Sequence, residues 1–132
     1  MEHMLDYSPE LLLLLFLIIT FLQSSIDKIT DWKGNLSWLK GHFADTPLKK
    51  WVPLLLGTVM FTELIAGVLC ALGVSQIILF GESGLARFGA VVSCISLLML
   101  LFGQRMAKDY EGAKTIAVYF IPAIFLVYLL QP

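Results

Sequence analysis

Charged residues are scarce in this 132-residue chain: only 14% are Asp, Glu, Lys or Arg, against about 25% in a typical soluble domain. Its formal net charge of −1 leaves no basic excess, which argues against a nucleic-acid-binding protein. Cysteine is also rare. The chain has two, Cys70 and Cys94, which are too few for a disulfide framework or a cysteine-only metal site. Hydrophobic residues instead make up 58% of the chain, which argues against both a water-soluble globular domain and a disordered one.

Four long apolar stretches dominate the sequence, and each approaches the roughly 20 residues that a helix needs to cross the hydrocarbon core of a bilayer. They are rich in Leu, Ile, Val and Phe and do not alternate with polar residues as a barrel strand would. Because backbone groups in hydrocarbon must be satisfied within their own segment, we predict an all-α fold, a four-transmembrane-helix bundle that forms one integral membrane domain over residues 1–132. The predicted spans are about 10–29, 51–78, 85–103 and 113–130.

Basic residues predict the orientation of these spans. No Lys or Arg precedes Lys28, so we interpret the first stretch as a retained span and not as a cleaved signal peptide. Arg87 alone borders the second loop, and the other basic residues flank the first and third loops. The positive-inside rule therefore predicts that loops one and three are cytoplasmic and that both termini lie outside. The residues that flank loops one and three are Lys28, Lys33, Lys40, Lys49, Lys50, Arg105, Lys108 and Lys114.

The first loop, residues 31–50, has a helical periodicity of its own. Apolar residues recur on one helical face at Trp32, Leu36, Leu39 and Phe43. Tryptophans suit the headgroup level, so we predict a short interfacial helix on the cytoplasmic leaflet, with Gly34 and Gly41 marking its ends. Thr46 and Pro47 form a typical helix start, and Pro53 is expected to bend the second span.

Glu63 is the most informative residue. It lies about twelve positions into the second span, roughly 18 Å along a helix that rises 1.5 Å per residue, which is near mid-bilayer. A charged side chain there costs at least about 2.5–3.5 kcal/mol, so we expect Glu63 to face the bundle interior and to find a partner or a proton. Two interpretations remain open: a proton, ligand or redox-coupled site, or a protonated or hydrogen-bonded glutamate that holds helices together.

Hydroxyl and amide groups are expected at the same depth as Glu63. Counted from the cytoplasmic ends of the spans, Ser93 is level with Glu63, and Thr20 and Gln23 lie in the inner half of the first span. Such groups can hydrogen-bond a carboxyl group across helices. The sequence therefore predicts an intramembrane polar centre of Glu63, Thr20, Gln23 and Ser93.

A charged cap is predicted at the cytoplasmic ends of the helices, formed by Asp27, Lys28, Arg105 and Asp109. The alternative is that each charge is simply solvated in its loop. We interpret Lys28 and Arg105 as interface markers whose long stems carry the charge to water, although such stems are also long enough to reach inward.

Small residues on the second span, Gly67, Ala71 and Gly73, predict close packing against the third span. The chain shows no nucleophile–base pair, no C-x-x-C motif, no pair of intramembrane histidines for haem and no glycine-rich phosphate loop. We therefore assign no catalytic residue and no metal site, and we expect no catalytic activity of its own.

Three segments carry a resemblance to a known family. The run from Glu63 through Gly67 to Gly73, ELIAGVLCALG, resembles the second-helix signature of the DoxX family. FLQSSIDKI resembles that family's small-x-x-Lys pattern, with Ser25 where glycine is usual and Lys28 at the lysine, and WLKGHFADTPL resembles the segment before the second helix. At Gly103-Gln104-Arg105 the sequence departs from members that carry a histidine there. The resemblance implies a four-helix protein of the bacterial inner membrane, so that termini on the outside would lie in the periplasm. Relatives in that family include a subunit of a thiosulfate–quinone oxidoreductase.

The leading functional hypothesis is therefore an accessory subunit of a quinone-linked or other respiratory redox complex in the membrane. Its expected partners are membrane lipid and other membrane protein subunits, with a quinone or a lipid as the ligand that contacts it and no covalently bound cofactor. The alternative is a small proton-coupled transporter that uses Glu63 as its coupling carboxyl group. A third hypothesis, an enzyme acting on a lipid or quinone between the helices, lacks a nucleophile–base pair.

Overall fold

The computed structural model describes residues 2–132 and is built from helices, with no β-strand in that range. The all-α prediction is confirmed, and the four predicted spans correspond to four helices that are long and apolar enough to cross a membrane. These long helices are α2 (Ser8–Thr30), α4 (Val52–Phe80), α5 (Gly84–Met106) and α6 (Tyr110–Leu129). The shorter elements are α1 (Glu2–Asp6), α3 (Trp32–His42) and the 3-10 helix η1 (Lys49–Trp51).

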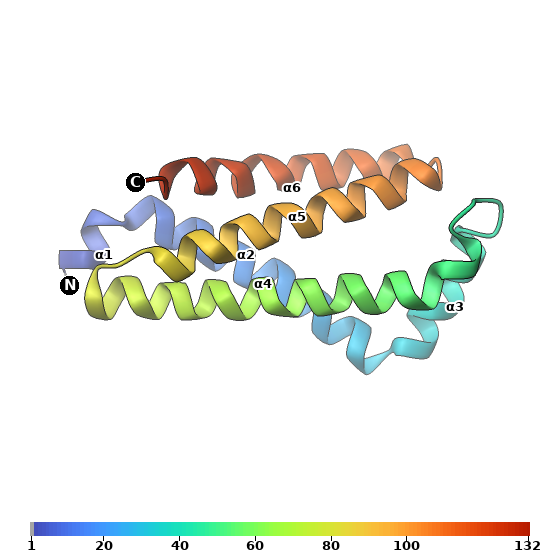
Figure 1. The fold of residues 1–132 in the computed structure, drawn as a ribbon, viewed down its shortest axis with the longest axis horizontal. Helices are drawn as coiled ribbons and strands as arrows, with labels where there is room; N and C mark the ends of the chain where they lie inside the picture. The colour runs from blue at the N-terminus through green and yellow to red at the C-terminus, as the bar shows by residue number, and fades with distance from the viewer. Residues whose placement is uncertain (1) are drawn as a thin grey trace.

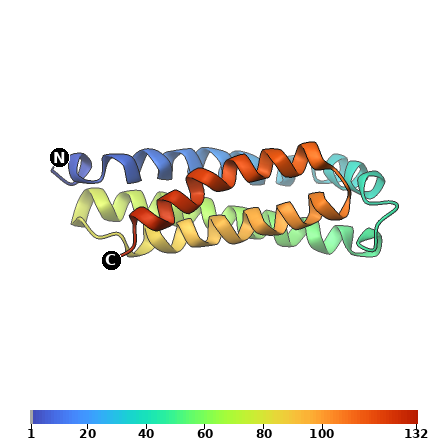
Figure 2. The same ribbon diagram turned by 90° about the horizontal axis from the view of Figure 1, so that it is seen from above.

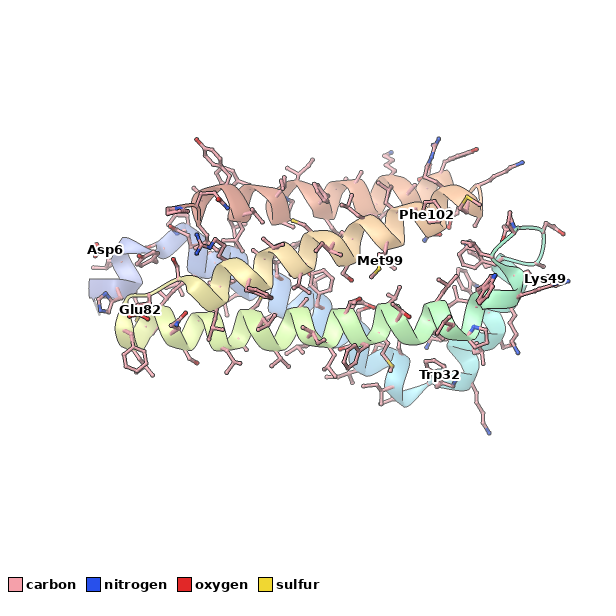
Figure 3. All side chains as sticks on the ribbon, in the orientation of Figure 1. Asp6, Trp32, Lys49, Glu82, Met99 and Phe102 are labelled. Carbon is pink, nitrogen blue, oxygen red and sulfur yellow. The ribbon has the colours of Figure 1, made fainter. Side chains whose placement is uncertain are left out.

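The four long helices run along a common axis (Figures 1 and 2). Helix α4 makes the most extensive contacts, with α5 and α2, whereas α6 packs mainly on α5. At one end, here called the α1 end, lie α1, the link between α4 and α5, and the C-terminus (Figure 1). The opposite end, here called the α3 end, holds α3 and the link between α5 and α6. In Figure 3, Asp6 and Glu82 mark the α1 end, and Trp32 and Lys49 mark the α3 end.

Local sequence explains where the helices begin and end. Pro53 lies in the first turn of α4, where its missing N–H costs no helical hydrogen bond, so it starts the helix and does not bend it. Gly81 ends α4 in the left-handed conformation, with φ of 70°, which glycine adopts without strain. Asp109 caps α6, because its carboxylate accepts a hydrogen bond of 2.9 Å from the backbone N–H of Gly112.

The segment between α2 and α4 differs in detail from the sequence-based expectation. Helix α3 contains both Gly34 and Gly41, so neither glycine ends it. Thr46 starts only a turn, in which its hydroxyl accepts a 3.2 Å hydrogen bond from the Leu48 N–H, and α4 itself begins later at Val52. The predicted apolar face of α3 is half-buried against the rest of the chain.

Helices α4 and α5 are in backbone contact near the α1 end. A Cβ atom added to Gly73 would lie 2.5 Å from the Cα of Ala86, and one added to Gly89 would lie 2.9 Å from the backbone N of Cys70. Toward the α3 end the two helices diverge (Figure 1). The α4–α5 pair is therefore closed at one end and open at the other.

The other small residues of α4 contact different neighbours. Gly67 faces α2, because a Cβ atom there would lie 2.5 Å from Cδ2 of Leu22. Ala71 is only half-buried. Of the three small residues for which the sequence suggested packing against the third span, Gly73 alone makes a close backbone approach to α5, and Gly67 makes its approach to the first span.

Candidate functional site

A buried ion pair joins α2 to α4. The Nζ of Lys28 lies 2.9 Å from Oε1 of Glu63, whose side chain is 3% exposed, while that of Lys28 is 17% exposed. Lys28 also donates a 2.6 Å hydrogen bond to Oγ of Ser24, one turn earlier on α2. Glu63 therefore faces the interior between the helices and has a cation as its partner.

The position of Lys28 differs from the interface marker that the sequence suggested. Its stem turns inward because a buried carboxylate in a medium of low dielectric attracts an ammonium group more strongly than it would in water. Ser24 was not singled out from the sequence. Its signal is the four-residue spacing to Lys28, which places both side chains on one face of the helix.

The ion pair leaves one carboxylate oxygen without a hydrogen bond. Oε1 of Glu63 lies within ion-pair distance of Lys28 but has no hydrogen-bond partner in residues 2–132. A buried acceptor that lacks a donor costs free energy. Oε1 is therefore an acceptor that a ligand or a proton would satisfy.

A first cavity meets the ion pair from the side of Lys28. It has a volume of about 450 Å³, lies between α3, α4 and α5, and is here called the α4–α5 cavity. Apart from Lys28, Thr58 and Gln104, its walls are apolar or glycine. Figure 3 shows one of these residues, Met99, projecting from α5 toward α4. The cavity fills the space that opens where α4 and α5 diverge.

A second hollow meets the ion pair from the side of Glu63. It is a groove of about 510 Å³ between α2 and α6, here called the α2–α6 groove. The groove brings together three members of the predicted polar centre, Glu63, Thr20 and Gln23. Its polar lining residues are Thr20, Gln23, Ser24, Asp27, Glu63 and Tyr119.

Ser93, the fourth member of the predicted polar centre, lies elsewhere. Its Oγ is 3.9 Å from Sγ of Cys70, which is about two helical turns beyond Glu63 on α4. On α5, Ser96 instead lies near the level of Glu63, with its Oγ 3.4 Å from Oγ1 of Thr62. Depth counted from the α3 end misplaced Ser93, because the short link between α4 and α5 sets their register from the α1 end.

The four residues of the predicted charged cap do not form one cluster. Lys28 belongs to the buried ion pair, and Asp27 is exposed and lines the α2–α6 groove. The guanidinium of Arg105 lies over the ring of Tyr110, 5.0 Å from its centroid. Asp109 caps α6. Each residue therefore has different neighbours.

His42 links α3 to Gln104 of α5, which lines the α4–α5 cavity. Its Nε2 lies 3.1 Å from Oε1 of Gln104 and 3.6 Å from Oδ2 of Asp109. The imidazole also stacks on Trp38, with ring centroids 4.6 Å apart. The sequence offered no signal for this contact, because the partners on α5 and α6 are more than sixty residues away along the chain.

The described residues contain no group of three or more His, Cys, Asp or Glu side chains that could hold a metal ion. Cys70 and Cys94 are both free and buried. The chain was compared with protein-family models, curated proteins and solved structures. Nothing matches.

Proposed function

We propose that this chain is an accessory subunit of a quinone-linked redox complex in the bacterial inner membrane and that its α4–α5 cavity binds a quinone or a lipid. The observation that carries the proposal is an apolar cavity of about 450 Å³ that Lys28 helps to line. Apolar walls with a few placed polar groups are typical of ligand sites. Because Glu63 already neutralises Lys28, a neutral head group with a carbonyl oxygen suits the cavity better than a free anion.

The DoxX resemblance supports this proposal. Lys28 and Glu63 carry that resemblance from two different segments of the sequence, and their side chains meet as an ion pair. Gly67 and Gly73, which complete the matching pattern, both lie where α4 approaches another helix closely. All four residues that match the family pattern therefore make contacts between helices in this chain.

We further propose that the long helices form a transmembrane bundle with the α3 end in the cytoplasm. Eight of the nine basic residues lie in or next to the segments at that end, which the positive-inside rule assigns to the cytoplasm. Trp38 and Trp51 are exposed there and suit the headgroup level, so α3 lies at the interface. Both termini are then periplasmic.

The cavity proposal is tested by filling the cavity. Leu98 lines it and Leu72 does not, yet the two side chains are 50% and 49% exposed, so they form a matched pair. We expect the wild-type protein, purified in mild detergent, to retain quinone or lipid together with its partner subunits. Leu98→Trp should reduce the bound amount several-fold, as measured by solvent extraction and mass spectrometry, whereas Leu72→Trp should leave it unchanged. Equal amounts in both variants would count against the cavity as the binding site.

A second candidate function is proton-coupled transport. The observation that favours it is that Glu63 lines the α2–α6 groove while its partner Lys28 lines the α4–α5 cavity, so one ion pair separates two hollows. A carboxyl group so placed can exchange a proton for a cation. Glu63→Gln should then abolish uptake of ethidium driven by a proton gradient in proteoliposomes. If Glu63→Gln lowers the thermal stability of the protein but leaves uptake unchanged, Glu63 has a structural role and not a transport role.

A further inference from the structure

We propose that the α2–α6 groove is a second binding site and that it takes a monovalent organic cation with an apolar body. This site is separate from the α4–α5 cavity and does not depend on what that cavity binds. Four features of the groove point to such a ligand: its charge, its buried acceptor, its aromatic wall and its length.

The charge of the groove favours a single positive charge. Two carboxylates line it, those of Glu63 and Asp27, and no Lys or Arg does. Lys28 contacts Glu63 but itself lines the opposite cavity. The ammonium therefore balances one carboxylate, and the groove keeps a net charge of −1, which one monovalent cation would neutralise.

The acceptor is the carboxylate of Glu63. The side chain of Glu63 is only 3% exposed and lines the groove. Its Oε1 has no hydrogen-bond partner among residues 2–132. Attraction between charges is stronger at such a site than in water, because the surroundings screen them less. Because Lys28 already balances the charge of Glu63, the net attraction for a cation in the groove comes chiefly from Asp27 at the exposed end.

The aromatic wall favours an organic cation over an inorganic one. Phe16 of α2 and Tyr119 of α6 both line the groove, with ring centroids 6.1 Å apart. Aromatic faces attract cations, and most strongly where water is excluded. A volume of about 510 Å³ also far exceeds what a metal ion would fill.

The length of the groove suits a bulky or elongated ligand. Asp27 and Phe16 are eleven residues apart on α2, which corresponds to roughly 16 Å along the helix. The groove thus runs from an acidic end to an aromatic and aliphatic end. Because α6 contacts α2 only sparsely, the groove lies between helices that leave room for entry from the side.

The test uses two probes of the same shape and opposite charge, tetraphenylphosphonium and tetraphenylborate. Equilibrium dialysis of the full-length protein in non-ionic detergent should show saturable binding of tetraphenylphosphonium, with one site per chain, and no saturable binding of tetraphenylborate. Asp27→Asn should weaken binding about tenfold, and Phe16→Leu several-fold. Asp45→Asn, which changes an exposed aspartate outside the groove, should leave binding unchanged.

Saturable binding of tetraphenylborate with equal affinity would overturn the proposal, as would wild-type affinity in both Asp27→Asn and Phe16→Leu. Because Asp27 is exposed, its variant is expected to fold, and gel filtration with circular dichroism checks that it does. Leu98→Trp, which fills the other cavity, should bind tetraphenylphosphonium normally. Loss of quinone in that variant with retention of the cation would separate the two sites.

Discussion

Replacing Lys28 with Met is expected to lower the free energy of unfolding by about 3 kcal/mol, the low end of the range for breaking a buried ion pair. The substitution keeps an unbranched apolar stem but leaves the carboxylate of Glu63 almost fully buried with no cation beside it. We expect the low end of that range because the Lys28 side chain is 17% exposed, so the ion pair is not completely buried. Equilibrium unfolding in mixed detergent micelles measures the change.

The matched control is Lys33→Met, which changes an exposed lysine of α3 and should have almost no effect. The double variant Lys28→Met with Glu63→Gln should recover most of the lost stability, because no charge then remains unpaired. If Lys28→Met unfolds like Lys33→Met, the ion pair does not hold α2 and α4 together. If the double variant is no better than Lys28→Met, the loss comes from packing and not from charge.

Gly73→Ala is expected to destabilise the protein by about 2–3 kcal/mol, in the range for overpacking a close contact. The added Cβ would lie 2.5 Å from the Cα of Ala86, a backbone atom that cannot move without displacing α5 from α4. The same unfolding assay applies. The predicted cost is large for the addition of one methyl group because both contact partners belong to helix backbones.

Two other glycines of α4 provide controls for this prediction. At Gly57 the nearest atom to an added Cβ is Cη2 of Trp32 at 3.7 Å, so Gly57→Ala should be neutral or gain up to about 1 kcal/mol from helix propensity. Gly67→Ala should fall between the two, because its closest neighbour is the flexible end of Leu22. Equal stability of the Gly57 and Gly73 variants would contradict the close contact between α4 and α5.

The long helices could be predicted from the sequence because length and hydropathy decide them almost alone. The four apolar stretches become α2, α4, α5 and α6, with ends that differ from the expected spans by a few residues. The structure of the segment before α4 is harder to predict from the sequence, because its turns depend on packing as well as on propensity. Thr46 and Pro47 resemble a helix start in isolation, yet the α-helix begins only at Val52.

The candidate site could be anticipated only in part. Glu63 can be identified from the sequence because a carboxylate in a long apolar run is costly unless it faces the interior between the helices. Thr20 and Gln23 line the same groove because they lie on the adjoining helix. Ser93 was misplaced because counting residues measures depth along one helix and not the register between two. The contact of His42 with Gln104 joins distant parts of the chain and leaves no local pattern.

The contrast between the two ends of the α4–α5 pair limits where a bound molecule can change the shape of the protein. Helices α4 and α5 are held in close contact where Gly73 meets Ala86. Any increase in the distance between them that is caused by a molecule bound in the cavity must therefore occur at the α3 end. That movement would displace α3 and its His42 contact first, and would leave the termini still. Occupancy of the cavity would thus alter the surface of the protein at the α3 end and not at the α1 end.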